Sequence, residues 1–306
     1  MFQLPGDGKE KKPSYNSPFD TPIKPAAALR NQGRRFSLPS AGSAAHGGSR
    51  HADILSRDYE LEQTNLTNLV EYLRQEVKEQ EKQKVMAATG SVIRYELPDH
   101  SVVWLNSGST LRYPTVFKKD NRNVELKGEA YFEVEADRKR PFYVNTPAGL
   151  SVYVYGTKFN VNAYEDDNSI ETVLEKGKVN VISPDGKTTV QLAPGERLLY
   201  NKVDQKLLKG KVDVYEKVAW KDGKLIFRNA ELGEIFKRLA RHFNVDIQFN
   251  NISGKEYKYR ATFRNETLPQ ILDYLAKSAA LKWRTEEAVQ QADDTFTKKK
   301  IIVDLY

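Results

Sequence analysis

Between Gly90 and Trp220 the chain consists almost entirely of short runs rich in Val, Tyr, Phe and Thr, such as VIRYEL, SVVWL, AYFEV and KVNVI. Turn sequences separate these runs, among them PDHS, NSGS, TPAG and SPDG. Runs of this length and composition are typical of strands, and the closely spaced turns leave no room for helices between them. We therefore expect residues 88–214 to form an all-β domain, either a sandwich, a roll or a solenoid-like structure.

After this segment the chain contains an internal repeat. The stretch FRNAELGEIFKRLARHF begins at Phe227, and a near copy, FRNETLPQILDYLAKSA, begins at Phe263. Each copy ends a short strand and continues with Leu, Ile, Phe and Ala at helical spacing, which predicts an amphipathic helix. Asn229 and Asn265 are the expected N-caps. Residues 215–306 are therefore expected to form a small α+β domain, in which the two strand–helix units share one sheet.

The first part of the chain has a different composition. Residues 1–57 are rich in Pro, Gly, Ser, Ala and Arg without apolar periodicity, which predicts a disordered tail. Over residues 58–84 apolar side chains recur at helical spacing, which predicts an amphipathic helix. No run of about 18 apolar residues occurs, and the N-terminus lacks the apolar segment of a secretory signal, so we expect neither a membrane helix nor an export signal in this chain.

Composition also limits the partners and cofactors. Cysteine is absent, which excludes disulfides and thiolate metal sites. The net charge of +7 and the pI near 9.2 are compatible with a nucleic-acid partner, but basic residues alternate with acidic ones, as in NRNVELKGEAYFEVEADRKR. This mixture is typical of a solvated surface. His, Asp and Glu also lack metal-ligand spacing. We therefore expect no nucleic acid, no metal and no cofactor.

The sequence offers little that would support an enzyme. Asp99, His100 and Ser101 are adjacent in a predicted turn, where consecutive side chains point in different directions, so they do not predict a catalytic triad. The pair Asp166–Asp167 lies in another predicted turn, without apolar surroundings that would raise a pKa. His242 lies near the end of the first repeated helix, where a cation favours the helix dipole. We expect no enzyme that acts on a small molecule.

One peptide bond has chemistry of its own. Gly156 and Thr157 lie within the strand-like sequence VYVYGTKFNVNAY. The Thr hydroxyl can attack the carbonyl of the preceding residue and convert the amide into an ester, which requires a strained peptide bond and no outside nucleophile. Glycine leaves that carbonyl open. A β-bulge or a turn is the alternative interpretation of the same dipeptide.

Long blocks of the chain resemble a known family. ELPDHSVVWLNSGSTLRYPTVF, RNVELKGEAYFEVEADRKRPFYVNT and VYVYGTKFNVNAYED are similar to the FecR-type periplasmic domain of anti-sigma regulators. WKDGKLIFRNAELGEIFKRLARHFNVDIQF is similar to the C-terminal domain of Bacteroidetes members of that family. This domain is in turn similar to the secretin and TonB short N-terminal domain, a doubled βαβ unit. The resemblance extends from about Gly90 to the C-terminus.

The resemblance implies a function in cell-surface signalling and transcription regulation. Members lie in the periplasm, bind the N-terminal signalling domain of a TonB-dependent outer-membrane transporter, and control an extracytoplasmic-function sigma factor. They usually carry a cytoplasmic sigma-binding domain and a membrane helix that anchors them in the inner membrane, and neither is found in this sequence. Direct sigma-factor binding by this chain therefore stays open.

Two motifs of the family can be compared residue by residue. Some members cleave themselves within G-T-x-F-x-V, and the matching residues are Gly156, Thr157, Phe159 and Val161. Self-cleavage at Gly156–Thr157 is therefore an expectation from the resemblance. PDHS stands where the family usually has PDGS, so that His100 occupies a turn position that glycine normally fills.

For the partner surface we expect strand edges of the C-terminal domain, because a partner's strand can add to an open edge through main-chain hydrogen bonds. The candidate edges are residues 257–263 and 297–305. The expected contact residues on the first of these are Tyr257, Tyr259, Arg260, Thr262 and Phe263.

An alternative function belongs to a different class. The protein could be a soluble glycan-binding or scaffold β-domain protein without sigma-factor activity. In that case Trp104, Tyr113 and Tyr131 are the expected exposed aromatic side chains.

Overall fold

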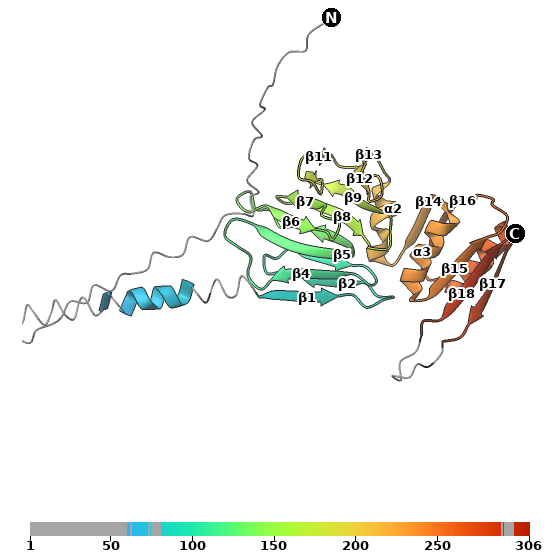
Figure 1. Cartoon of the computed structure of the whole chain (residues 1–306), viewed down its shortest axis with the longest axis horizontal. Coiled ribbons are helices and arrows are strands. Elements are labelled where there is room, and N and C mark those ends of the chain that lie inside the picture. The colour runs from blue at the N-terminus through green and yellow to red at the C-terminus, as the bar shows by residue number, and fades with distance from the viewer. Residues whose placement is uncertain (1–59, 62, 73, 75–80, 289, 291–296) are drawn as a thin grey trace, which may run out of the picture. The chain divides into compact units, whose positions relative to one another are not determined.

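The computed structural model describes residues 60–61, 63–72, 74, 81–288, 290 and 297–306 (Figure 1). Contacts between Cα atoms divide the chain into two units, Met1–Leu61 and Glu62–Tyr306, and the sheets and domains of the fold belong to the second unit. The predicted tail, residues 1–57, lies outside the described residues. The described residues from 60 to 74 are helical, as predicted, but the predicted helix end at Lys84 is wrong. Lys82 and Lys84 lie in strand β1, where Val85 pairs with Leu111 and packs on the β core.

The β domain consists of β1 to β13. These strands are β1 (Lys82–Met86), β2 (Ile93–Glu96), β3 (Val102–Leu105), β4 (Thr110–Pro114), β5 (Arg122–Glu133), β6 (Phe142–Asn145), β7 (Ser151–Val154), β8 (Lys158–Ala163), β9 (Ser169–Lys176), β10 (Val179–Ile182), β11 (Thr189–Leu192), β12 (Glu196–Asn201) and β13 (Leu207–Lys211). The all-β expectation is confirmed.

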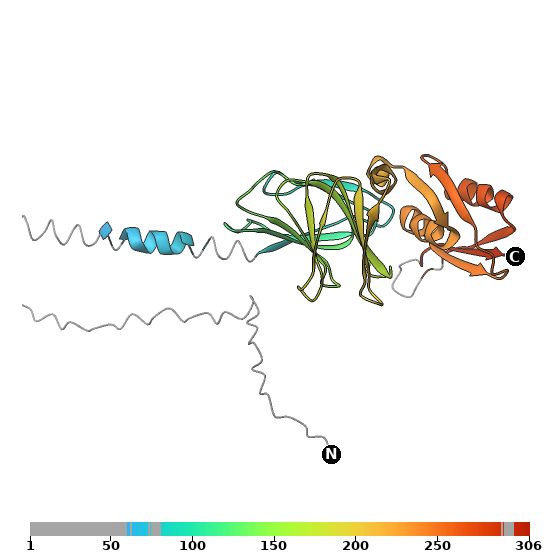
Figure 2. The same cartoon turned by 90° about the horizontal axis from the view of Figure 1, so that it is seen from above.

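The long strand β5 joins the two halves of one curled sheet. Its first residues pair with β6 and β4, and residues from Gly128 onward pair with β8. One half continues through β7, β10 and β11, and the other through β9, β12 and β13. The sheet is strongly curled (Figure 2). Its buried apolar side chains form one core. This core includes Val103, Leu111, Leu126, Phe132, Phe142, Val152, Phe159 and Val181.

A short helical linker follows the β domain. Helix α2 (Val214–Val218) and the 3-10 turn η1 (Ala219–Asp222) lead into the C-terminal domain. Val218 and Trp220 form a separate apolar cluster with Tyr131, and Trp104 packs against it. The indole N–H of Trp220 donates to Asn160 Oδ1 at 3.3 Å. The linker is thereby fixed to the outer surface of the β domain.

The C-terminal domain is α+β and duplicated, as predicted. Its elements are β14 (Leu225–Glu231), α3 (Leu232–Phe243), β15 (Asp246–Asn251), β16 (Lys258–Phe263), α4 (Leu268–Ser278), β17 (Leu281–Glu286) and β18 (Lys300–Leu305). The apolar faces of both helices contribute to one core with the strands.

The two strand–helix units share one sheet, as expected, but the domain also contains a second sheet that was not expected. The strand before each helix pairs with its counterpart, as β14 with β16, whereas β15 and β17 flank β18 in a second sheet. The equivalent residues Ile226 and Thr262 are direct partners, and the equivalent rings of Phe227 and Phe263 lie 6.1 Å apart. The two copies are thus related by a local two-fold axis. β18 lies outside the repeated motif, so the repeat did not predict the second sheet.

The two asparagines do not cap the helices. Asn229 has a φ of +58° in a β-bulge between Arg228 and Ala230, and β14 continues to Glu231, the N-cap of α3. Asparagine tolerates this left-handed conformation better than most residues. The N-cap of α4 is Thr267, whose backbone N–H donates to Gln270 Oε1 at 2.8 Å. This Thr-x-x-Gln capping box determines where the second helix begins.

Candidate functional site

Strand β16 forms a two-stranded sheet with β14 and, among the described strands, has one edge without a paired strand. Within the described part of the chain it pairs with β14 alone. The side chains of Tyr259 and Phe263 pack against the core, whereas those of Arg260 and Thr262 are exposed. A two-stranded sheet gains stability when a third strand is added. β16 is therefore a site where a partner's strand can continue the sheet.

The opposite edge of this sheet, on β14, is closed by side chains. Arg238 Nη1 on α3 donates to the carbonyl oxygen of Ile226 at 3.0 Å. The carboxylate of Glu216, buried on α2, lies beside the backbone N–H of Arg228, which acts to lower the pKa of Glu216 against the larger effect of burial. The Ile226 carbonyl is therefore satisfied and the Arg228 N–H is covered without a neighbouring strand, which protects β14 from edge-to-edge pairing. β16 has no such cover in the described residues.

The alternation of backbone groups identifies the residues of the open edge. Ile226 and Arg228 direct their backbone groups away from β16, as their contacts with Arg238 and Glu216 show. Neighbouring residues of a strand point to opposite edges, so Leu225 and Phe227 point toward β16. Leu225 is opposite Phe263, and Ile226 is opposite Thr262. On β16 it is therefore Lys258, Arg260 and Thr262 that direct their backbone groups to the open edge.

The structure sorts the expected contact residues into two groups. Arg260 and Thr262 are exposed, but Phe263 is 8% exposed and belongs to the core. Tyr257 and Tyr259 are half-buried and pack on the same core, and Ser278 Oγ donates to Tyr259 Oη. The expectation that residues 297–305 form a second open edge is wrong, because β18 has a strand on each side. β18 is the central strand of its sheet, and its apolar side chains are buried.

The Gly156–Thr157 bond lies at a tight junction between β7 and β8. Thr157 is 4% exposed, and its hydroxyl donates to the carbonyl oxygen of Lys178 at 3.0 Å. Gly156 has a φ of +142°, and a Cβ there would lie 2.8 Å from the backbone of Ala136. A Cβ on Gly177 would lie 2.9 Å from Thr157 Oγ1 and 3.0 Å from the Gly156 carbonyl oxygen. Gly177 therefore packs closely on the hydroxyl and the carbonyl, while Gly156 packs on Ala136.

Asp99, His100 and Ser101 form no triad, as expected. Asp99 binds Arg122 Nη1 at 2.8 Å and accepts the Ser101 hydroxyl at 2.8 Å, and all three groups are buried. The His100 ring points to the surface and pairs with Glu96 at 2.9 Å. His100 has a φ of +67°, which confirms the turn position.

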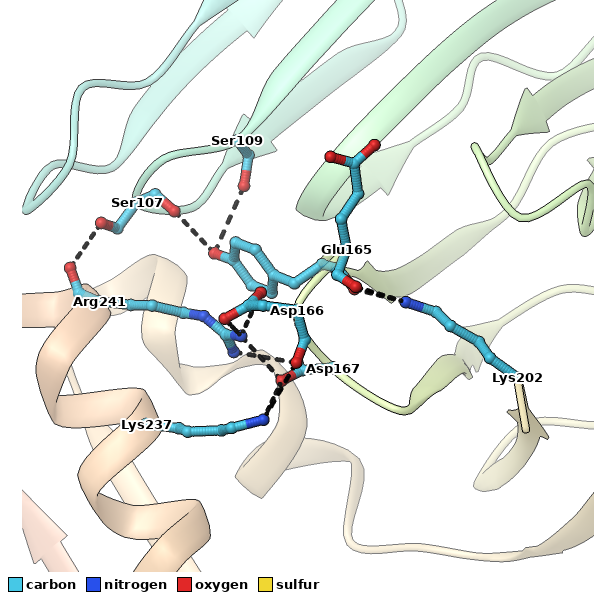
Figure 3. A network of polar contacts seen from close by, with 9 residues as sticks. Ser107, Ser109, Glu165, Asp166, Asp167, Lys202, Lys237 and Arg241 are labelled. Atoms are coloured by element: carbon cyan, nitrogen blue, oxygen red, sulfur yellow. Dashed lines mark hydrogen bonds and ion pairs between the residues drawn. The ribbon is translucent and has the colours of Figure 1, made fainter. Parts of the chain in front are cut away.

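The junction between the β domain and the C-terminal domain is held by charged contacts. Figure 3 shows Arg241 and Lys237 of α3 reaching the loop after β8. Arg241 Nη2 donates to both oxygens of Asp166 at 2.8 Å and to Asp167 Oδ1 at 2.8 Å. Lys237 Nζ lies 3.3 Å from Asp167 Oδ1. Burial acts to raise the pKa of Asp166, but the hydrogen bonds from Arg241 outweigh it and lower that pKa.

Neutral contacts support the same junction. Ser107 Oγ donates to the backbone carbonyl of Arg241 at 2.6 Å (Figure 3). The same oxygen accepts the N–H of Gly90 at 2.7 Å. The guanidinium carbon of Arg241 lies 3.9 Å from the ring centroid of Tyr164, and the hydroxyl of Tyr164 donates to the carbonyl of Ser107. These contacts close a ring of interactions around the C-terminal turn of α3. Such a ring allows little change at one member without a change at the others.

A cavity of about 660 Å³ lies beside this junction. Glu129 is part of its lining, and its carboxylate accepts hydrogen bonds from Asn160 at 2.9 Å and from Asn106 at 2.8 Å. Burial raises the pKa of Glu129, against the effect of these two amides. Glu171 on another wall pairs with Arg197 and Lys217. The carboxylates are thus held by amides and cations, an arrangement without a nucleophile–base pair.

Sequence reasoning missed the junction. It assigned Asp166–Asp167 to a turn, which is correct, but gave the pair no partner. Lys237 and Arg241 lie one helical turn apart on the polar face of α3, so the sequence contains both halves of the contact. It does not indicate that they meet, because about 74 residues and many surface charges of both signs separate them.

The aromatic residues of the alternative hypothesis are not exposed. Tyr113 is 4% exposed and Tyr131 is 1% exposed. Trp104 is half-buried, and its ring centroid lies 5.5 Å from that of Tyr131, under the linker. The expectation that these three side chains form a glycan-binding surface is therefore wrong, since they serve to pack the linker and the core.

The described residues contain no group of three His, Cys, Asp or Glu side chains arranged to hold a metal ion. In the same residues, no helix has the length and apolar character required to cross a membrane.

Comparisons with known proteins extend over both domains. A family model described as "FecR protein" matches residues 83–180, and one described as "FecR, C-terminal" matches residues 224–290. A crystal structure of a Parabacteroides distasonis protein assigned as an anti-sigma factor is 30% identical, with a TM-score of 0.64, and the match covers 72% of this chain and 98% of that one. A second structure from that organism, assigned in the same way, is 29% identical, with a TM-score of 0.64 and coverage of 74% and 100%. A search of curated proteins found no match.

Proposed function

This chain belongs to the FecR family, and from that premise we propose that it is a cell-envelope regulator of the anti-sigma type. In this proposal it works in the periplasm, binds the signalling domain of a TonB-dependent transporter, and thereby controls an extracytoplasmic-function sigma factor. The similarity to two structures assigned as anti-sigma factors supports the regulatory role. The proposal includes no cofactor and no reaction on a small molecule.

The open edge of β16 is the observation that carries the partner proposal. One edge of the β14–β16 sheet is covered by Arg238 and Glu216, while the other is free in the described residues. Within this sheet a partner's strand can therefore add only beside β16, with Lys258, Arg260 and Thr262 supplying main-chain hydrogen bonds. The exposed side chains of Arg260 and Thr262 would provide selectivity.

The test removes one main-chain donor from that edge. Thr262→Pro deletes an N–H that points away from β14, so the β14–β16 pairing is expected to persist. We expect Thr262→Pro to weaken binding of the isolated transporter signalling domain by roughly tenfold, the effect of losing about one hydrogen bond from an interface. Thr262→Val, which keeps the N–H, is the matched control.

Hydrogen exchange then locates the partner. On binding, the amides of residues 258–263 are expected to become protected, and those of β17, the outer strand of the other sheet, are expected to exchange as before. Protection at β17 alone, or equal affinity of the wild type and folded Thr262→Pro, would contradict the assignment to β16.

A second proposed activity is self-cleavage at Gly156–Thr157. Thr157 Oγ attacks the Gly156 carbonyl carbon, the C–N bond breaks, and the hydroxyl proton passes to the departing nitrogen, which leaves an ester and a free amine. Water then hydrolyses the ester to the Gly156 carboxylate and restores the Thr157 hydroxyl. The support is the close packing of Gly177 on the hydroxyl and the carbonyl, and the fixed orientation of that hydroxyl by Lys178.

Thr157→Val is the sharpest variant for this reaction, because valine has the shape of threonine without the hydroxyl. Mass spectrometry of the purified wild type should show two pieces that end at Gly156 and begin at Thr157, and hydroxylamine should accelerate their formation by attacking the ester. Thr157→Ser should still cleave, and Thr157→Val should stay intact. A wild type that remains whole with hydroxylamine would exclude the reaction and leave the β16 proposal untouched.

A further inference from the structure

One outer face of the β domain has an unusual composition. On β6, β7, β10 and β11 the inward side chains are apolar and, apart from the partly buried Val190, fully buried, and the outward side chains alternate with them. These eight outward residues are Tyr143, Asn145, Ser151, Tyr153, Asn180, Ile182, Thr189 and Gln191. None is charged, although 29% of the whole chain is charged. We call this surface the tyrosine–amide face.

Strand register aligns these side chains in rows. Asn123 on β5 is opposite Tyr143, Tyr143 is opposite Tyr153, Tyr153 is opposite Asn180, and Asn180 is opposite Gln191. The row therefore crosses five strands, a distance of about 19 Å at the usual strand spacing. A parallel row contains Asn145, Ser151, Ile182 and Thr189. Charges return at the two borders of the face, at β5, where Glu125 pairs with Lys82, and at β11, where Lys209 Nζ donates to the carbonyl oxygen of Gln191 at 2.9 Å.

The tyrosines at the centre form a small cluster. The ring centroids of Tyr143 and Tyr153 lie 5.6 Å apart, and that of Tyr155 lies 6.3 Å from Tyr153 at an interplanar angle of 86°. Tyr155 is 45% exposed, and the other two are half-buried. Neighbouring rings restrict each other's rotation, so the cluster offers apolar ring surface at a low entropic cost.

We propose that the tyrosine–amide face binds a neutral carbohydrate chain. A sugar ring has an apolar C–H surface that packs on aromatic rings, and hydroxyls that both donate and accept hydrogen bonds. Tyrosine provides the ring surface, and Asn and Gln amides provide a donor and an acceptor in each side chain. The length of the row fits an extended chain of several sugar units better than a single sugar.

The absence of charge on these strands decides against other ligands. A nucleic acid would require Lys or Arg beside the aromatic rings to neutralise phosphates, and the outward positions of β6, β7, β10 and β11 provide neither. An acidic polysaccharide would meet the same obstacle. A neutral polyhydroxylated chain needs no counter-charge.

The test uses the purified full chain in native gels that contain a neutral polysaccharide. The probes are a β-1,3-glucan, a β-1,4-mannan, a xyloglucan and starch, with polygalacturonate as the charged comparison. We expect at least one neutral probe to retard the protein, at low and at high salt. Tyr143→Ala/Tyr153→Ala should weaken this binding by roughly five- to hundredfold, the usual range for lost aromatic stacking.

Matched variants separate binding from folding. Tyr153→Phe keeps the ring and should retain most of the affinity, while Tyr274→Ala removes an exposed tyrosine of α4 and should leave the affinity unchanged. Circular dichroism establishes that each variant is folded. The proposal is overturned if no neutral probe retards the wild type, or if the double variant binds as well as Tyr274→Ala. It is also overturned if light scattering shows a dimer that the double variant separates, because a second copy would then cover this face.

Discussion

At the scale of single residues, the buried ion pair of Asp99 and Arg122 has the largest energetic consequence. Arg122 is 1% exposed, and its guanidinium also donates to the carbonyls of Arg140 and Glu135. Its Nη2 has no hydrogen-bond partner. Among the described residues, Asp99 is the only carboxylate paired with Arg122. Arg122 lies at the start of the long strand β5.

Asp99→Ala is expected to lower the free energy of unfolding by about 3–5 kcal/mol, because it leaves a buried, uncompensated cation. Chemical denaturation measures this change. Asp99→Ala/Arg122→Met removes both charges and should recover part of the loss. A double variant that is less stable than Asp99→Ala would show that Arg122 contributes through its backbone contacts more than through the ion pair.

His100 illustrates a local cost in the backbone. Its φ of +67° lies in the left-handed region, which a glycine occupies at lower cost. Its exposed ring pairs with Glu96, mainly through a hydrogen bond, and this raises the pKa of His100. A raised pKa means that the pair stabilises the fold fully below the ordinary pKa of histidine, 6.5, and less as the pH rises through the folded-state value.

His100→Gly is therefore expected to raise the thermal midpoint by about 2 °C at pH 8, and by less at pH 5, where the wild type still has its ion pair. Calorimetry at the two pH values measures the difference. His100→Asn, which tolerates the same backbone conformation and does not titrate, is the control. An identical shift at both pH values would mean that the pair with Glu96 contributes nothing to stability.

At the scale of elements, α3 acts on two sides at once. Arg238 covers the β14 edge and lies over the ring of Phe227 at 4.4 Å, while Lys237 and Arg241 reach the β domain. The helix thus closes one sheet edge and joins two domains. A strand that binds at β16 would first change the position of its partner β14, and through β14 the hydrogen bond from Arg238 to Ile226.

Arg238→Met should open the β14 edge. We expect this variant to self-associate through that edge and to lose about 1–2 kcal/mol of stability, because the Ile226 carbonyl loses a charged donor. Sedimentation velocity measures the association. Lys237→Met, on the same helix but without a contact to β14, should remain like the wild type. If Arg238→Met stays monomeric, the edge is protected by α2 and Glu216 alone.

At the scale of the whole molecule, the Arg241 contacts couple the two domains and make the coupling depend on pH. The pKa of Asp166 is lowered in the folded state, so its contribution is present above the ordinary value of 3.8 and is lost as the pH falls through the lower folded-state value. Between pH 5 and 8 the coupling should therefore be constant, and it should weaken below about pH 4.

Arg241→Met is expected to reduce the stability of the junction by about 1–3 kcal/mol at pH 7, since it removes charge-assisted hydrogen bonds to two carboxylates. Calorimetry should resolve separate transitions for the two domains in this variant. The carboxyl signal of Asp166, followed by NMR, should titrate closer to pH 3.8. Lys237→Met, which removes two longer contacts to the same loop, should change both readouts less. One cooperative transition in Arg241→Met would show that the neutral contacts suffice.

Much of this organisation followed from local patterns. Runs rich in Val, Tyr and Phe predicted the β domain because alternate side chains of a half-buried strand must be apolar. The repeated apolar spacing predicted α3 and α4, since a helix needs one continuous apolar face. The position of His100 in a turn and the edge position of residues 257–263 were also predicted. Boundaries were less accurate, because Lys82 and Lys84 can belong equally to a helix end or to an edge strand.

The sequence by itself thus determined the two domain types, the duplicated helices and the candidate bond at Gly156–Thr157, all of which depend on neighbouring residues. Only the tertiary structure decided which strand edge is open, that Asp166 and Asp167 meet Arg241, and that uncharged side chains of β6, β7, β10 and β11 form one face. These features depend on contacts between residues far apart in the chain. Such contacts are selected by the burial of the whole core, and no local pattern of apolar and charged residues specifies them.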